Sequence, residues 1–164
     1  MKENVLLVYL NDHRAGAVAA LETIERLREI GPPTVPEHFL RQLDREIRED
    51  TEVLSDLIGR FGGEESKLKK TVAWLAEKVE RLKLSRDDPS DEAFALFQHL
   101  EILLLGIRGK RALWEVLEVV CRGDARFDEF DWHRLKQKAD KQMDQVEIYR
   151  LDTARMAFLD LEED

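Results

Sequence analysis

Apolar residues recur every three or four positions along most of the chain, and this spacing predicts an all-α protein. Four segments have the length of long helices, and a shorter fifth lies between the second and the third of them. The predicted helices span residues 3–30, 35–61, 64–84, 89–122 and 128–161. Gly31-Pro32-Pro33, Gly62-Gly63 and Gly123 separate the segments, and such residues end helices. We therefore expect a single helical domain over residues 1–164.

The segment 92–121 is the most apolar of the predicted helices. Between Leu100 and Ile107 nearly every side of this helix is apolar, which is typical of a helix buried on several faces. Glu101 nevertheless lies inside that run, and Arg108, Lys110 and Arg111 follow it. An unpaired charge in a core is costly, so these groups need partners from neighbouring helices, or a metal. We expect the polar centre of the protein beside this helix.

The connections between the segments predict how the helices run. The short connection after residue 30 makes the first two helices antiparallel neighbours. The segment 64–84 has one narrow apolar stripe and is long enough, at ~30 Å, to return along the other helices as a crossover. The next helix would then run parallel to the second. His13 and Asp50 interrupt the inward stripes of the first two helices at similar heights, so we expect them to meet.

Two antiparallel pairs of long helices, a long crossover and inward-facing acids at mid-helix together resemble the ferritin-like superfamily. The resemblance implies a four-helix bundle and a two-iron centre, with a Glu from each of two helices and a Glu-x-x-His from each of the others. Glu101 matches the position expected on the third long helix. The first helix offers His13 instead of Glu, and residues 46–52 on the second offer acids but no His. The sequence from Glu147 to Arg150 has Arg where the family has His.

The Arg at this position favours an ion-pair network over a metal centre. A guanidinium group stays protonated and has no lone pair for a metal. We therefore expect a non-catalytic structural or interaction module without a cofactor, whose core contains a buried polar network. Its predicted members are His13, Asp50, Glu101, Arg108, Glu147 and Arg150. If the network is buried, Arg150→Ala should lower the free energy of unfolding by roughly 3–5 kcal/mol.

Two other functions stay open from the residues alone. The first is a metal-dependent oxidoreductase or iron-handling protein with a rearranged iron or manganese site. Its predicted ligands are His13, Glu49, Asp50, Glu101 and Glu147. The second is a bundle that binds an apolar ligand or haem between subunits, for which the sequence contains no ligand signature.

Composition and charge narrow the choice of possible compartments and partners. The formal net charge of −9 argues against nucleic acid, because phosphate binding needs clustered Lys and Arg. No secretion signal is recognised at the start, and no uncharged run reaches the ~18 residues of a membrane span. The single cysteine, Cys121, fits a reducing compartment and reads as an apolar filler. We expect a cytoplasmic protein.

The start of the first helix predicts a homodimer. Residues 5–10 are six consecutive apolar residues, whereas a bundle helix buries only about three positions in seven against its own core. Leu7 and Val8 should therefore point partly away from the core and need cover from the crossover or from a second subunit. Symmetric pairing of the same patch on two chains is the common solution.

Overall fold

The structure is a computed structural model that describes residues 1–63 and 89–159, without the side chains of residues 89–91. Within these ranges it contains no strand, and the predicted all-α class is confirmed. The helices are α1 (Glu3–Ile30), α2 (Glu37–Arg60), α4 (Pro89–Val120) and α5 (Trp132–Phe158), with a short 3-10 turn, η2 (Ala125–Phe127). The predicted crossover helix, residues 64–84, lies outside the described residues.

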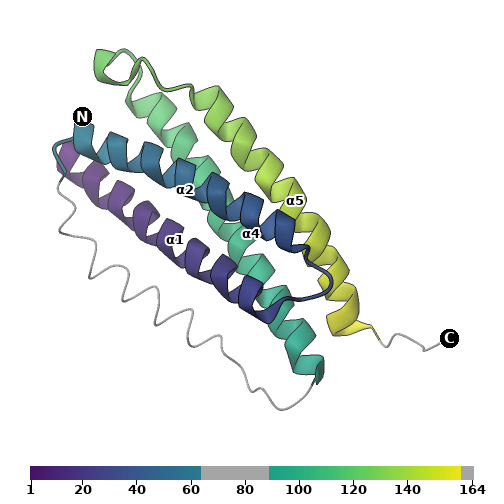
Figure 1. The fold of residues 1–164 in the computed structure, drawn as a ribbon. Coiled ribbons are helices and arrows are strands. Elements are labelled where there is room, and N and C mark those ends of the chain that lie inside the picture. The colour runs from purple at the N-terminus through teal and green to yellow at the C-terminus, as the bar shows by residue number, and fades with distance from the viewer. Residues whose placement is uncertain (64–88, 160–164) are drawn as a thin grey trace.

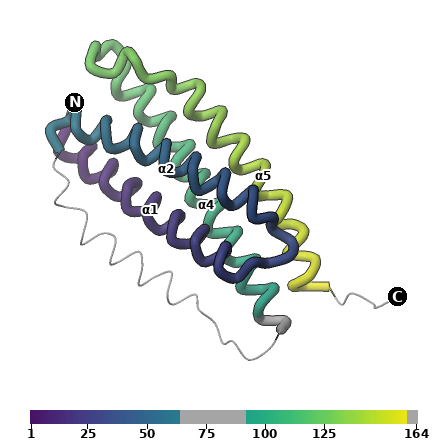
Figure 2. Tube along the Cα trace, in the orientation of Figure 1, coloured from purple at the N-terminus to yellow at the C-terminus, as the bar shows by residue number. Residues whose placement is uncertain are grey.

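The four long helices lie side by side in two antiparallel pairs, α1 with α2 and α4 with α5 (Figure 1). The trace in Figure 2 shows that α2 and α4 run in the same direction. The end of α2 and the start of α4 therefore lie at opposite ends of the molecule. Gly31 makes the tight turn between α1 and α2, since its φ of 61° lies in the left-handed region that glycine adopts without strain.

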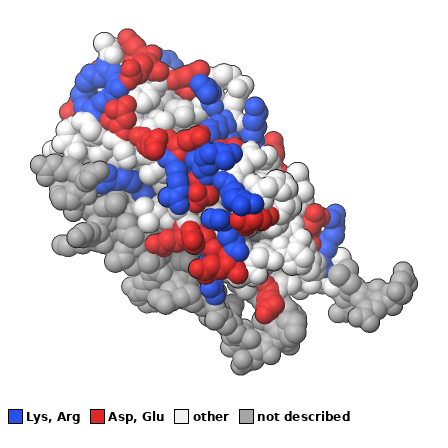
Figure 3. Space-filling model, in the orientation of Figure 1, with Lys and Arg blue, Asp and Glu red and all other residues white. Residues whose placement is uncertain are grey.

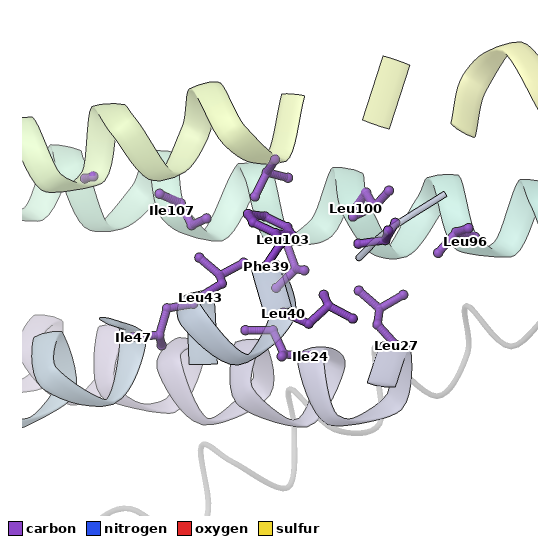
Figure 4. Close-up of a cluster of buried hydrophobic side chains, with 13 residues drawn as sticks. Ile24, Leu27, Phe39, Leu40, Leu43, Ile47, Leu96, Leu100, Leu103 and Ile107 are labelled. Atoms are coloured by element: carbon purple, nitrogen blue, oxygen red, sulfur yellow. The ribbon is translucent and has the colours of Figure 1, made fainter. Parts of the chain in front are cut away.

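The apolar core consists of two clusters that follow one another along the helices. The first cluster takes residues from all four helices, including Val146 of α5. Figure 4 labels its members from the other three helices, among them Ile24, Leu40 and Leu103. The second is built around Trp114 and is closed by the 3-10 turn. On α2 the first cluster ends at Ile47 and the second begins at Leu54, and on α4 the corresponding residues are Ile107 and Leu113. The turn of α2 that holds Asp50 and the turn of α4 that holds Lys110 thus lie between the two clusters.

The start of α5 differs from the prediction. The helix begins at Trp132, and Asp131 caps it by accepting a hydrogen bond from the Arg134 N–H at 2.9 Å. Before it, the buried ring of Phe127 stacks on Phe61 with ring centroids 4.7 Å apart. The predicted start at residue 128 is wrong because this contact holds the preceding residues in the 3-10 turn.

The central helix is less enclosed than its apolar sequence predicts. Leu100, Leu103 and Ile107 are buried, but Leu105 is 67% exposed on the opposite side of α4. The apolar run therefore leaves one side of α4 exposed in the single chain, although several of its apolar residues are buried.

Candidate functional site

Asp50 forms the polar centre of the molecule. Its side chain projects from α2 toward α4 and α5 and is only 4% exposed. The Oδ2 atom accepts a hydrogen bond from Nζ of Lys110 on α4, and Oδ1 lies 2.8 Å from Nζ of Lys138 on α5. The amide nitrogen of Gln142 lies 3.4 Å from Oδ2. Both carboxylate oxygens of Asp50 are therefore occupied by ammonium groups from two other helices.

Further side chains complete a network around this contact. The amide of Gln142 donates to Glu46 at 2.9 Å, and its oxygen accepts from Lys110. Lys138 also reaches Glu49, with Nζ 2.9 Å from a carboxylate oxygen. We call this set the Asp50 cluster, which comprises Glu46, Glu49, Asp50, Lys110, Lys138 and Gln142. Both of its lysines pair with Asp50, and Lys138 also pairs with Glu49, whose side chain is more than half exposed.

The two lysines of the Asp50 cluster hold their protons unequally. Burial lowers the pKa of Lys110 below its usual range, because the attraction of Asp50 only partly offsets the loss of water. Burial also acts to lower the pKa of Lys138, but its hydrogen bonds to Asp50 and Glu49 outweigh that effect and raise the pKa. The charge of Lys138 is thus well compensated, and that of Lys110 depends on Asp50.

A second ion-pair group joins α4 to α5. The Arg150 guanidinium makes two hydrogen bonds to Glu147, at 2.7 and 2.8 Å, and one to Glu101 at 3.2 Å. Hydrogen bonding from Arg150 holds the pKa of Glu147 below its usual range. The Glu101 and Glu147 side chains are 46% and 38% exposed, so water screens these contacts. This group lies at the surface of the helix pair.

The six residues of the predicted network are divided in the structure. Glu101 and Glu147 each contact Arg150, and Asp50 belongs to the separate Asp50 cluster. Arg108 is exposed, and within the described part of the chain it pairs with no acid of α5.

His13 does not bond to Asp50 in the part of the chain that the structure describes. Its ring instead lies edge-on against Tyr9, with centroids 4.6 Å apart. Burial lowers the pKa of His13, and the nearby charge of Asp12 opposes this only in part. The imidazole is therefore biased toward its neutral form.

A cavity of about 380 Å³ lies beside the Asp50 cluster, between α1, α2 and α4. His13 and Asp50 are both in its wall, so the two predicted residues share a cavity instead of a bond. Lys110, Tyr9 and Trp114 also line it. The Trp114 side chain is 1% exposed, and its indole N–H has no acceptor among the described residues.

The predicted metal ligands are not gathered at one point. Glu49 and Asp50 both contact Lys138, Glu101 and Glu147 both contact Arg150, and His13 lies on the cavity wall. In residues 1–63 and 89–159, no three His, Cys, Asp or Glu side chains are close enough to hold a metal ion.

Sequence reasoning missed Lys138 and Gln142 as partners of Asp50. Gln142 lies three residues after Ala139 and four before Val146, which is the spacing of one helix face, and this was the available signal for a buried polar partner. Lys138 lies beside that face and reaches Asp50 through its long side chain.

Cys121 is buried in the second apolar cluster and is 3% exposed. Burial raises the pKa of its thiol, which keeps the sulfur protonated and weakly nucleophilic. This position fits a side chain that fills space.

Comparison of the chain with protein-family models, curated proteins and solved structures returned no match. Among the described helices, none combines the length and the apolar character needed to cross a membrane. On the face shown in Figure 3, Lys and Arg alternate with Asp and Glu, and neither sign forms a continuous patch.

Proposed function

We propose that the protein is a non-catalytic helical module of ferritin-like arrangement, in which lysine ammonium groups replace metal ions at mid-bundle. The observation that carries the proposal is the contact of both Asp50 oxygens with Lys110 and Lys138. A cation that bound Asp50 would have to displace two ammonium groups and would lie beside their positive charges. The cluster thus acts as a fixed structural centre and needs no cofactor.

The helix directions support the ferritin-like part of the proposal. Two antiparallel pairs with α2 and α4 in the same direction require a connection that spans the length of the molecule, as in that superfamily (Figure 2). In this proposal Arg150 corresponds to the family's histidine and Glu101 to a family glutamate, and the two side chains lie 3.2 Å apart. In this proposal the guanidinium group again stands where the family holds a metal ion.

In this proposal the module is a cytoplasmic homodimer that acts through its surface. Val5 and Val8 support the dimer, since they are 65% and 63% exposed on one side of α1. Val116 and Val119 of α4 add exposed apolar area. Apolar patches of this kind mark protein contacts when they are contiguous.

Metal analysis after anaerobic purification tests the proposal. The parent protein and Asp50→Asn are each incubated with Fe(II) or Mn(II), desalted and measured by mass spectrometry. We expect both proteins to retain the same trace of metal, far below one equivalent per chain. One or two equivalents in the parent that disappear in Asp50→Asn would show a metal centre and overturn the proposal.

A further inference from the structure

We propose that the homodimer forms through the outer face of α4, with the α4 helices of the two chains packed side by side in opposite directions. The inference rests on the homodimer proposed above, and it names the interface and its orientation. An uncharged stripe along α4 supplies the contact. Charges of alternating sign beside the stripe select the antiparallel arrangement.

The outer face of α4 carries an uncharged stripe with the spacing of a coiled-coil seam. Its positions follow one another in alternating steps of three and four residues, which keeps them on the side of a helix that packs against another helix. More than a third of the residues in the chain are charged, so a solvent-facing stripe of this length without a charge is unusual. The stripe consists of Ile102, Leu105, Gly109, Ala112, Val116 and Val119.

The stripe is open to solvent in the single chain. Leu105 and Val119 are each 67% exposed, Ala112 and Val116 are exposed as well, and the remaining two members are half-buried. The buried residues of α4, such as Leu103, lie on its other side. Exposed apolar residues that form a continuous surface mark a protein contact.

The start of α1 extends this surface. A shallow depression is lined by Met1 and Val5 together with Val116 and Val120 of α4. Val5 is 65% exposed and Met1 is 59% exposed. The exposed apolar residues of the first turns of α1 and of the last turns of α4 therefore border one another. A second chain that packs on α4 also reaches Val5.

The stripe is complementary to itself when the second helix runs in the opposite direction. Gly109 and Ala112 lie at its centre, where small side chains allow two helices to approach closely, and the larger members lie toward both ends. In a two-fold interface, a residue that faces a second residue on the partner is matched by the reverse contact. With the axis at the centre, the facing pairs are Ile102 with the partner's Val119, Leu105 with the partner's Val116, and Gly109 with the partner's Ala112.

Charges beside the stripe fix the direction of the second helix. Glu101, Arg108, Glu115 and Arg122 follow one side of the stripe at intervals of seven residues, and their signs alternate. Residues that flank a helix seam form ion pairs across it and set the orientation of the partner. The same two-fold axis brings Arg108 beside the partner's Glu115 and Glu101 beside the partner's Arg122. Every such contact joins opposite charges.

A parallel pair would leave these charges without partners. In a parallel pair, one flank of each seam lies beside the opposite flank of the other, and here that flank holds the uncharged Gly106, Leu113 and Val120. Arg108 is exposed and forms no ion pair among the described residues, so the partner's Glu115 supplies its countercharge. Complementary charges of this kind determine orientation more than affinity.

Equilibrium sedimentation at micromolar concentration tests the interface. Leu105→Glu places a charge inside the stripe and should turn the dimer into a monomer. Ile148→Glu is the matched control, because Ile148 is 59% exposed on α5 and lies outside the stripe. Circular dichroism checks that both variants fold. A folded Leu105→Glu protein that stays dimeric would overturn this interface and leave the homodimer standing, whereas a monomeric parent would overturn both.

Exchange of two charges tests the contact between Arg108 and Glu115. Arg108→Glu and Glu115→Arg should each raise the Kd of the dimer about tenfold, because each makes both symmetry-related contacts repulsive. The two changes combined in one chain restore opposite charges and should return the Kd to near the parent value. Arg45→Glu is the control, because Arg45 is exposed on α2 and its replacement should leave the Kd unchanged. A combined variant that dimerises more weakly than either single variant would show that the two residues do not meet.

Disulfide formation tests the direction of the helices. Leu105→Cys and Val116→Cys are each made with Cys121→Ala and oxidised alone or mixed. A disulfide needs Cα atoms within about 7 Å, but in an antiparallel pair two copies of the same residue lie about 16 Å apart along the helix. We therefore expect cross-linking only in the mixture, between one chain of each kind. Cross-linking of each variant with itself would show a parallel pair and overturn the proposal, as would a dimeric mixture that does not cross-link.

Discussion

Lys110 of α4 and Asp50 of α2 are sixty residues apart in the chain and in direct contact inside the protein. Lys138 of α5 contacts the other oxygen of the same carboxylate, so one aspartate joins three helices. The contact lies between the two apolar clusters of the core. A buried polar contact of this kind sets how the helices are aligned along one another, because sliding one helix would leave its charge unpaired.

Asp50→Asn should lower the free energy of unfolding by about 3–5 kcal/mol, measured by urea denaturation at pH 7. The amide is nearly the same shape as the carboxylate, but Lys110 and Lys138 would lose their shared countercharge in a buried place. Asp56→Asn is the matched control on the same helix, because Asp56 is 52% exposed and pairs with Arg60 at the surface. Its cost should stay below ~1 kcal/mol. Equal costs for the two variants would contradict the assignment of Asp50 as the buried centre.

Lys110→Met should cost less than Asp50→Asn, about 1–2 kcal/mol in the same urea experiment. Methionine keeps most of the apolar stem, and Asp50 retains Lys138 as a partner 2.8 Å away. The lowered pKa of Lys110 agrees with this modest cost, because the folded protein solvates this ammonium poorly and gains little from its charge. If Lys110→Met is as destabilising as Asp50→Asn, Lys138 does not compensate Asp50 by itself.

Protonation of His13 should make the protein less stable in mild acid. Burial lowers the pKa of His13 in the folded state below the value of 6.5 that it has when exposed, so the unfolded chain binds the proton more readily. The stability that comes from keeping the His13 imidazole neutral is therefore present above pH 6.5, and it is lost as the pH falls toward the lower pKa of the folded state. The slope contributed by one such group is at most about 1.4 kcal/mol per pH unit.

Urea midpoints between pH 7.5 and pH 5 measure this effect. In His13→Gln the decline below pH 6.5 should be smaller than in the parent. His38→Gln is the control, because His38 is exposed at the start of α2 and its replacement removes no buried imidazole. A parent and a His13→Gln protein with the same pH profile would show that His13 is not held neutral.

Arg150→Ala should cost only about 1 kcal/mol, much less than a fully buried network requires. Water reaches both of its acidic partners, while its guanidinium also lies 5.6 Å from the centre of the Phe97 ring. Arg155→Ala is the control, since Arg155 forms one exposed pair with Asp152 on the same helix and should cost less than ~0.5 kcal/mol. A loss of 3 kcal/mol or more on Arg150→Ala would mean that the ion-pair group is buried by a contact beyond the single chain.

The homodimer should dissociate when charge is placed on the exposed side of α1. Leu7 is a poor site for this, because it packs against the second apolar cluster instead of pointing outward. The double variant Val5→Glu and Val8→Glu changes only exposed residues and should turn a dimer into a monomer in equilibrium sedimentation at micromolar concentration. Ser55→Glu adds charge to an exposed place on α2 and should leave the dimer intact. A parent protein that sediments as a monomer would contradict the prediction.

Local sequence information determined the helical class and most helix bounds. Apolar spacing and glycine or proline stops act over a few residues, and α1 was predicted at residues 3–30, where the structure has it. The start of α5 was missed because Asp128 and Asp131 are both suitable caps by sequence. The contact of Phe127 with Phe61, from the other half of the chain, selects Asp131.

The partners of Asp50 were decided only by the tertiary structure. The sequence marked Asp50 as a polar interruption of an apolar stripe, and Lys110 as a charge in need of a partner. It could not show that they meet, because that depends on how far each helix is rotated and shifted against the next. Lys138 lies beside the inward stripe and still reaches the centre, since a lysine side chain is long and flexible. Periodicity shows which side of a helix faces inward, but only the packing of three helices determines which charges come together there.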